Sequence, residues 1–338
     1  MPANTWTWQR TVSIFISLAI VGLAYWNRAW LIEAFGLLRE GRPLWLIAAL
    51  VIILLGYLIS SQVIRVMLRS LGFPFGIFRV WMLAVVAIVI SQSVPAGGVG
   101  SYAFLVSSFN RRGVPPGKAT LVASLETLSY VIAMVCTFGF SVIYLATRDL
   151  FTGESSYLAA ATGILLISAA VFVLTRSEET LQRWLLTLKN GVAWLLRRQW
   201  GDAWVLGIVA ELHLGRQLIA SRRRDVILLV MIQITGLSAH ALAMLSVLYG
   251  LGAHTNFAVV MVAFGIALVT STFNVLPGGG GTVEAALVAV LTQLDVGPAA
   301  VPAAIIFRLL NFWLIAPVAA LGYTWLTHEA PVVNEVRE

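Results

Sequence analysis

The stretch PAGGVGSYA at residues 95–103 occurs a second time, in related form, as PGGGGTVEA at residues 277–285. A shift of 182 positions aligns the two stretches without a gap, and it also places Glu126 on Arg308. The same shift pairs further identical residues: Val114 with Val296, Pro116 with Pro298 and Leu128 with Leu310. An apolar chain that repeats a Pro-Gly break, followed each time by one charge at an equivalent position, predicts an internal symmetry.

The composition predicts an all-α integral membrane protein. Residues of the AVILMFWYC set make up 59% of the 338 positions, charged residues make up 11%, and the mean hydropathy is +0.91, all outside the range of ordinary soluble domains. The net charge of +7 lies in short segments beside long apolar runs, which indicates membrane topology and anionic headgroups. Since no basic stripe carries interleaved aromatic residues, we do not expect nucleic-acid binding.

Cysteine and histidine spacing predicts neither a metal site nor a cofactor. Cys136 is the only cysteine, so one chain can form no disulfide framework. The four histidines lack the i, i+4 spacing of a helical metal pair: His213, His240, His254 and His328. For His240, which falls within an apolar run, a core histidine is a better interpretation than a proton relay.

Apolar windows define the expected membrane segments, since a helical span needs about 20 residues. The charge-free windows are residues 11–27, 44–63, 80–110, 127–147, 155–175, 226–283 and 309–327. The first could be a signal peptide, but bulky residues follow it where a cleavage site needs small ones, so we expect a retained signal anchor. The third and sixth are too long for one helix, and each contains one of the Pro-Gly breaks.

The pieces after the breaks are too short to span a membrane. Residues 101–110 and 282–294 would be roughly 15 to 20 Å long as helices, against a hydrocarbon core of about 30 Å. They predict two re-entrant hairpins, at about residues 80–110 and 257–294, whose tips end near mid-membrane. Irregular backbone at that depth must be buried in protein or line a wet cavity.

The loop charges orient the chain. Residues 176–224 carry nine Lys and Arg against four acids, which predicts a cytoplasmic segment; its mixture of Trp, Leu and basic residues suggests an interfacial amphipathic helix, with a solvated linker as the alternative. Threading the chain from there predicts six full spans, two oppositely oriented hairpins and an outer loop at residues 28–42. Both termini would lie in the cytoplasm of a bacterium, and residues 1–150 and 151–338 would form an inverted repeat.

Three ionisable residues mark the expected site. Glu126 and Arg308 each lie ten residues after a proline that can open a helix, which places them about 15 Å deep, and Glu284 follows the second break. Arg308 would bind a phosphate, with glycine N–H groups and the helix N-termini at Ser101 and Thr282 helping, while the two glutamates balance it or contact a cationic headgroup. The candidate binding residues are Arg308, Glu126, Glu284, Gly97, Gly98, Gly279, Gly280, Asn274, Asn311 and Tyr130.

Two structural alternatives stay open for this site. Arg308 could form a buried ion pair with Glu126 or with Glu284 that merely joins the two halves, although buried pairs are a poor source of stability. The glycines could simply permit close helix packing. Four consecutive glycines at residues 278–281 exceed what packing needs and favour an irregular turn.

These motifs resemble a flippase-like family, the lysylphosphatidylglycerol synthase transmembrane region, which is also the membrane half of the multiple peptide resistance factor. The similar features are a Pro-Gly-Gly-x-Gly break, here PAGGVG and PGGGGTVEA, and an Arg in the final helix, here Arg308 in IIFRLLNFW. The resemblance covers residues 45–325 and implies transfer of lipids between leaflets. Two-domain members carry a soluble domain that attaches an amino acid to phosphatidylglycerol; because this chain ends at Glu338, we do not expect synthase activity.

The sequence therefore predicts a bacterial inner-membrane lipid flippase or lipid transporter that works by alternating access. The cargo would be an anionic phospholipid, hopanoid or polyprenyl-phosphate-type lipid, the partners are membrane lipids, and a homo-oligomer stays open. The alternative is an ion-coupled carrier of a small polar anion, because inverted repeats with broken helices suit that equally. A lipid-modifying enzyme is the least favoured class, because the sequence contains no HExxH, P-loop or evident carboxylate cluster.

Overall fold

The computed structural model describes residues 28–93, 97–148, 178–195, 223–272 and 281–328, and all regular elements in these ranges are helices. Within these ranges, four helical stretches are long and apolar enough to cross a membrane: Pro43–Ser70, Pro116–Thr147, Arg224–Gly250 and Gly297–Thr327. The prediction of an all-α multi-pass membrane protein is confirmed to this extent. The windows at residues 11–27 and 155–175 lie outside the described residues, so the total of six spans stays a prediction.

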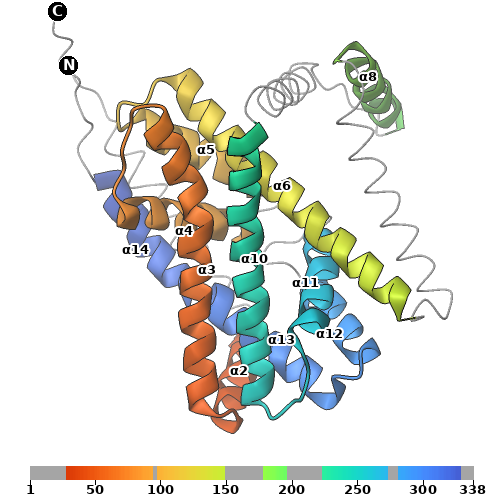
Figure 1. The fold of residues 1–338 in the computed structure, drawn as a ribbon. Coiled ribbons are helices and arrows are strands. Elements are labelled where there is room, and N and C mark those ends of the chain that lie inside the picture. The colour runs from red at the N-terminus through yellow and green to blue at the C-terminus, as the bar shows by residue number, and fades with distance from the viewer. Residues whose placement is uncertain (1–27, 94–96, 149–177, 196–222, 273–280, 329–338) are drawn as a thin grey trace, which may run out of the picture. The chain divides into compact units, whose positions relative to one another are not determined.

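The described helices repeat one order, long, short, short, long (Figure 1). The first set follows α2 (Arg28–Glu40) and comprises α3 (Pro43–Ser70), α4 (Ile77–Ser93), α5 (Gly97–Asn110) and α6 (Pro116–Thr147). The second set comprises α10 (Arg223–Gly250), α11 (Phe257–Thr272), α12 (Thr282–Gln293), and the continuous run of η2 (Gly297–Ala299), α13 (Ala300–Arg308), η3 (Leu309–Trp313) and α14 (Ile315–His328). The division into repeats at residues 150 and 151 stays a prediction.

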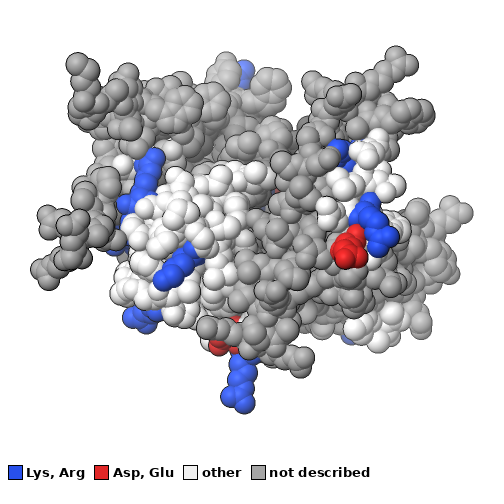
Figure 2. Space-filling model, turned by 90° about the horizontal axis from the view of Figure 1, so that it is seen from above, with Lys and Arg blue, Asp and Glu red and all other residues white. Residues whose placement is uncertain are grey.

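Contacts divide the chain into two compact units, Met1–Ser141 with Met231–Glu338, and Val142–Val230. The second unit contains α8 (Glu178–Leu195), a helix within the predicted amphipathic insertion at residues 176–224. Whether α8 lies at a membrane interface stays a prediction. The face shown in Figure 2, seen from above the view of Figure 1, is mostly uncharged where the chain is described, with scattered Lys and Arg side chains and few acids.

Proline and glycine set the ends of the long helices. Pro43 and Pro116 stand first in α3 and α6, where the missing N–H costs nothing. Gly72 (φ +88°) and Gly252 (φ +79°) adopt the left-handed conformation after α3 and α10. In both places the next N–H bonds back to a carbonyl of the last turn, Phe73 to Leu68 at 2.8 Å and Ala253 to Leu248 at 3.0 Å, which is how glycine ends a helix.

The long helices α3 and α10 lie side by side and run in opposite directions (Figure 1). Near the start of α3, the Arg42 N–H donates to the carbonyl of Gly250 at 2.9 Å, at the end of α10. Further along α3, a Cβ on Gly56 would lie 2.7 Å from Cε1 of His240, so glycine permits the close approach. An inverted repeat requires this direction for its first helices; the inversion of the complete units stays a prediction.

The short helices form two packed pairs, α4 with α5 and α11 with α12. With 17, 14, 16 and 12 residues, the four helices measure about 18 to 26 Å and fall short of a core of about 30 Å. They coincide with the predicted hairpins at residues 80–110 and 257–294. The breaks themselves, residues 94–96 and 273–280, lie outside the described residues, and the re-entrant course stays a prediction.

The last long helix of each set packs on a short helix of the other set. A Cβ on Gly322 of α14 would meet the Met82 side chain of α4, with Cγ at 2.7 Å. A Cβ on Gly265 of α11 would meet Oγ of Ser141 and lie 2.9 Å from the carbonyl oxygen of Thr137, both on α6. Glycine therefore permits close approach at both crossings, and the two sets of helices are interlocked rather than merely adjacent.

One local prediction is extended and one is wrong. Residues 28–42, expected as an outer loop, contain the helix α2 (Arg28–Glu40), which contacts α3 and α13; the side of the membrane on which it lies stays a prediction. The first break was expected to extend to Ser101. Instead α5 begins at Gly97, because packing against α4 outweighs the roughly 1 kcal/mol that each helical glycine costs.

The second break follows its prediction more closely. Gly281 has φ +80° and stands immediately before α12, where a residue with a Cβ would be strained. The irregular turn predicted from the glycine run is therefore confirmed at this position. The preceding glycines lie outside the described residues.

Candidate functional site

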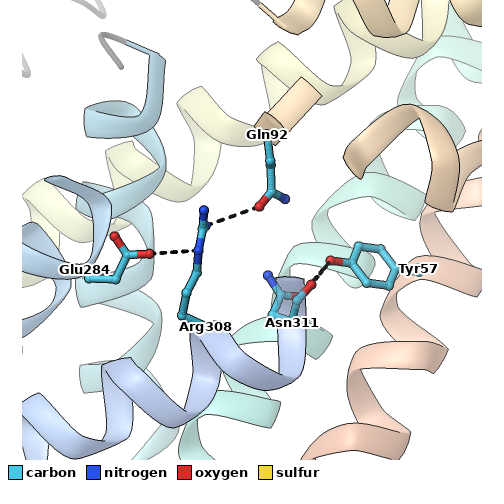
Figure 3. A network of polar contacts seen from close by, with 5 residues as sticks. All are labelled: Tyr57, Gln92, Glu284, Arg308 and Asn311. Atoms are coloured by element: carbon cyan, nitrogen blue, oxygen red, sulfur yellow. Dashed lines mark hydrogen bonds and ion pairs between the residues drawn. The ribbon is translucent and has the colours of Figure 1, made fainter. Parts of the chain in front are cut away.

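Arg308 contacts both short helix pairs at once (Figure 3). Its Nε lies 3.1 Å from Oε1 of Glu284, in the first turn of α12. Its Nη1 donates to Oε1 of Gln92, in the last turn of α4, at 3.2 Å. Of the two ion pairs that the sequence left open, the structure contains the one between Arg308 and Glu284.

The pair is largely shielded from solvent. The exposed fractions of the Arg308 and Glu284 side chains are 13% and 20%, and the guanidinium also lies 4.6 Å from the ring centroid of Phe312. Oε2 of Glu284 is buried and has no hydrogen-bond partner in the part of the chain that the structure describes. Because desolvating two charges can cancel their attraction, a shielded and incompletely bonded pair is a weak structural link and a good candidate for ligand binding.

A π-helical turn, η3, follows Arg308 directly. At the end of this turn, the N–H of Leu314 donates to the carbonyl of Leu309, five residues earlier, at 2.9 Å. Pro317, in α14, has no N–H to donate to the carbonyl of Trp313, which leaves the helix unable to continue its regular pattern there. Such turns often occur at functional sites, and the equivalent region of α6 is an uninterrupted α-helix.

The π turn directs Asn311 toward α3. Oη of Tyr57 lies 2.8 Å from Oδ1 and 2.9 Å from the backbone oxygen of Asn311, so its single proton is donated to one of the two (Figure 3). The Tyr57 ring, 3% exposed, packs edge-on against His240 at 4.7 Å. Tyr57 was not among the predicted site residues, although it is the single tyrosine within the apolar window at residues 44–63.

His240 is buried on α10. Its Nδ1 donates to the carbonyl of Gly236 at 2.9 Å, and its Nε2 has no hydrogen-bond partner among the described residues. This environment fits the predicted core histidine only in part, because Nε2 has no hydrogen-bond partner among the described residues.

Glu126 does not join the Arg308 group. It faces the Gln233 side chain of α10 and lies one turn before Tyr130 on α6, so the two share a helix face. Tyr130 lies within electrostatic range of Glu126 and of Tyr57. No Lys or Arg of the described segments forms a salt bridge with Glu126.

The other predicted site residues divide into two groups. Gly97 and Gly98 lie in the first turn of α5, and a Cβ on Gly98 would meet nothing within 4 Å, so packing does not require glycine there. Asn274, Gly279 and Gly280 lie outside the described residues. Within the described ranges no three His, Cys, Asp or Glu side chains form a group that could hold a metal ion; the expectation of no cofactor stays a prediction.

Comparison with known proteins identifies the family. The lysylphosphatidylglycerol synthase TM region matches residues 10–319, a stretch that includes both helix sets and Gln92, Glu284 and Arg308. A search of curated proteins finds no match. The family resemblance seen in the Pro-Gly breaks is thus confirmed over most of the chain. The family and the membrane-spanning helices of the chain suggest a role related to membrane lipids. The chain belongs to the lysylphosphatidylglycerol synthase TM region family.

Proposed function

We propose that this protein moves an amphipathic lipid with an anionic headgroup between membrane leaflets. The observation that carries the proposal is the position of Arg308, whose guanidinium contacts one residue beside each break, Gln92 and Glu284. The headgroup would occupy this site while its acyl or prenyl tails remain in the surrounding lipid. Family membership supports a lipid-related role, and the choice of cargo is part of the proposal.

The same contacts suggest how binding is linked to movement. A phosphate competes directly with the Glu284 carboxylate, because the planar guanidinium fork binds either anion in similar geometry. Occupation of Arg308 by phosphate would release Glu284, Gln92 or both, and would thereby loosen the connection between the α4–α5 and α11–α12 pairs. Such a link between ligand and helix contacts is what alternating access requires.

The remaining parts of the proposal concern class and location. We assign no catalytic reaction, and we expect the cargo to be an anionic phospholipid, hopanoid or polyprenyl-phosphate-type lipid. The protein would lie in the cytoplasmic membrane of a bacterium with both termini inside, as the basic segment at residues 176–224 favours.

The test is lipid transfer in reconstituted vesicles that contain acyl-labelled fluorescent phosphatidylglycerol. A membrane-impermeant reductant bleaches the outer leaflet, and the slower loss of signal reports transfer from the inner leaflet. Arg308→Ala removes one partner of a shielded charge pair, which typically costs about 2–5 kcal/mol, so transfer should fall by about 30-fold or more. Arg69→Ala, an exposed residue at the end of α3, should transfer at the wild-type rate.

Two outcomes would contradict the proposal. If folded Arg308→Ala protein transferred lipid at the wild-type rate, Arg308 would not be part of the binding site. Uptake of inorganic phosphate without any lipid transfer would favour the anion carrier instead.

A further inference from the structure

We propose that Glu126 is a proton-coupling site, which binds one proton when an anionic headgroup occupies Arg308 and releases it when the headgroup leaves. Lipid and proton would then cross in the same direction. The inference rests on the proposed function, since it assigns an energy source to the same transport cycle.

Two equivalent positions have different surroundings. Glu126 and Arg308 each lie ten residues beyond the proline of their helix run, Pro116 and Pro298. Arg308 has its counter-charge in Glu284 at 3.1 Å. Glu126 has no such counter-charge among the described residues, where its side-chain neighbours are the neutral groups described above.

Among the described residues, the titratable groups linked to this part of α6 include no Lys or Arg. They are Tyr130 on α6, within electrostatic range of Glu126, and Tyr102 on α5. One step further away are Tyr57 on α3, within electrostatic range of Tyr130, and His240 on α10. Tyr102 is hydrogen-bonded to Ser124 at 3.2 Å, and His240 packs on Tyr57. The helix α11, which meets α6 at Gly265, contains no titratable residue.

A proton is the cation that fits this position best. A carboxylate within an apolar span costs at least a few kcal/mol unless it is neutralised, and protonation neutralises it without further ligands. A metal cation such as Ca²⁺ would need about six or more oxygen ligands, whereas the described residues contain no cluster of three His, Cys, Asp or Glu. The amide of Gln233 can hydrogen-bond to either form of the carboxyl.

The charge balance sets the direction of coupling. Without cargo, Arg308 and Glu284 cancel each other, and an ionised Glu126 leaves one negative charge at this depth. A phosphodiester headgroup adds a second negative charge, which protonation of Glu126 would remove. Since net charge within the membrane is costly, bound cargo favours the protonated carboxyl, and the proton and the anionic lipid travel together.

Hydrogen bonds and electrostatic interactions connect the two positions. Tyr130 lies one turn from Glu126 and within electrostatic range of Tyr57. Tyr57 is hydrogen-bonded to Asn311, which lies in the π turn directly after Arg308. A shift of that turn on cargo binding would therefore change the position of Tyr57 and, through Tyr130, the electrostatic surroundings of Glu126.

The experiment measures the equilibrium leaflet ratio of acyl-labelled phosphatidylglycerol in vesicles with an imposed pH gradient. For one proton per lipid, a gradient of one pH unit shifts the ratio about tenfold toward the alkaline side. Glu126→Gln keeps the size and hydrogen bonding of the side chain, and it should transfer lipid but give a ratio that does not respond to the gradient. Asp295→Asn, a carboxylate in an exposed turn after α12, should respond like the wild type.

The outcomes separate this inference from the proposed function. If the wild type transfers lipid but its ratio ignores the gradient, or if Glu126→Gln keeps the tenfold shift, the inference is overturned while the function stands. If Glu126→Gln does not fold, Glu126→Asp replaces it, and a titratable carboxyl should preserve the shift; a lost shift overturns the inference.

A second measurement does not depend on transport. Infrared difference spectra of the purified protein, taken on addition of short-chain phosphatidylglycerol, should show a protonated carboxyl band that Glu126→Gln lacks and that phosphatidylcholine produces more weakly. Absence of the band in the wild type overturns the inference. Its presence supports proton binding, even if vesicle assays detect no lipid movement and the proposed function fails.

Discussion

Replacement of Arg308 by lysine tests whether the site needs the planar guanidinium with its several N–H donors or only a positive charge. The arginine uses two different nitrogens, Nε toward Glu284 at 3.1 Å and Nη1 toward Gln92 at 3.2 Å. A lysine ammonium is a compact point charge on a flexible stem. It can replace one of these contacts, but it does not reproduce the spacing of both.

The expected magnitude follows from the contact that is lost. A hydrogen bond to a charged group contributes about 1.5–3 kcal/mol, so Arg308→Lys should reduce lipid transfer by about 10- to 150-fold. The assay is the vesicle measurement with labelled phosphatidylglycerol, repeated at several lipid concentrations. Arg69→Lys, an exposed residue on α3, is the matched control and should transfer normally.

One result would refute this reasoning. If Arg308→Lys transferred lipid within twofold of the wild type while Arg308→Ala was inactive, positive charge alone would suffice. The simultaneous contact with both helix pairs would then have no functional meaning. Thermal unfolding in detergent must show in parallel that each variant is folded.

Three further substitutions test packing and hydrogen bonding in the described helices; the first two are read by thermal or chemical unfolding in detergent, and the third by hydrogen exchange. Gly265→Ala should lower the free energy of unfolding by about 1–3 kcal/mol through overpacking. Its control is Gly139→Ala, where a Cβ would meet nothing within 4 Å and the free energy of unfolding should rise by about 0.5–1 kcal/mol. Equal changes in the free energy of unfolding for the two variants would contradict this. Tyr57→Phe keeps the ring but loses the hydrogen bond to Asn311, so the loss should be about 0.5–1.5 kcal/mol. Arg112→Gln removes a 2.8 Å bond to a carbonyl of α14, which should speed hydrogen exchange in the last turn of that helix, and an unchanged rate would show that the bond does not hold it.

The sequence allowed the position of the charged residues along their helices to be predicted, because a helix rises by a constant amount per residue; their depth in a membrane stays a prediction. Pro116 opens α6, and Glu126 lies within it as expected. The rotation of each helix about its axis had no comparable signal, and rotation decides which neighbours a side chain meets. For this reason the choice of Glu284 over Glu126 as the partner of Arg308, and its contact with Gln92, emerged only from the structure.

Other features were missed for local reasons. The π turn inserts one extra residue into an apolar helix and leaves little trace in composition beyond Pro317. The glycines at the start of α5 were expected to be irregular because glycine propensity disfavours a helix, but tertiary packing overrode that preference at Gly97. The helix α2 was not predicted, because its charged residues suggested only a connection between two spans.

The crossings at Gly265 and Gly322 have a consequence for biosynthesis. Residues of α4 that lie against α14 are made more than two hundred positions before their partner, so they leave the ribosome without the surface that covers them. Contacts so distant in sequence are made late, after a long loop has closed. Either half expressed alone should therefore be short-lived in the membrane, and co-expression of the two halves should rescue both.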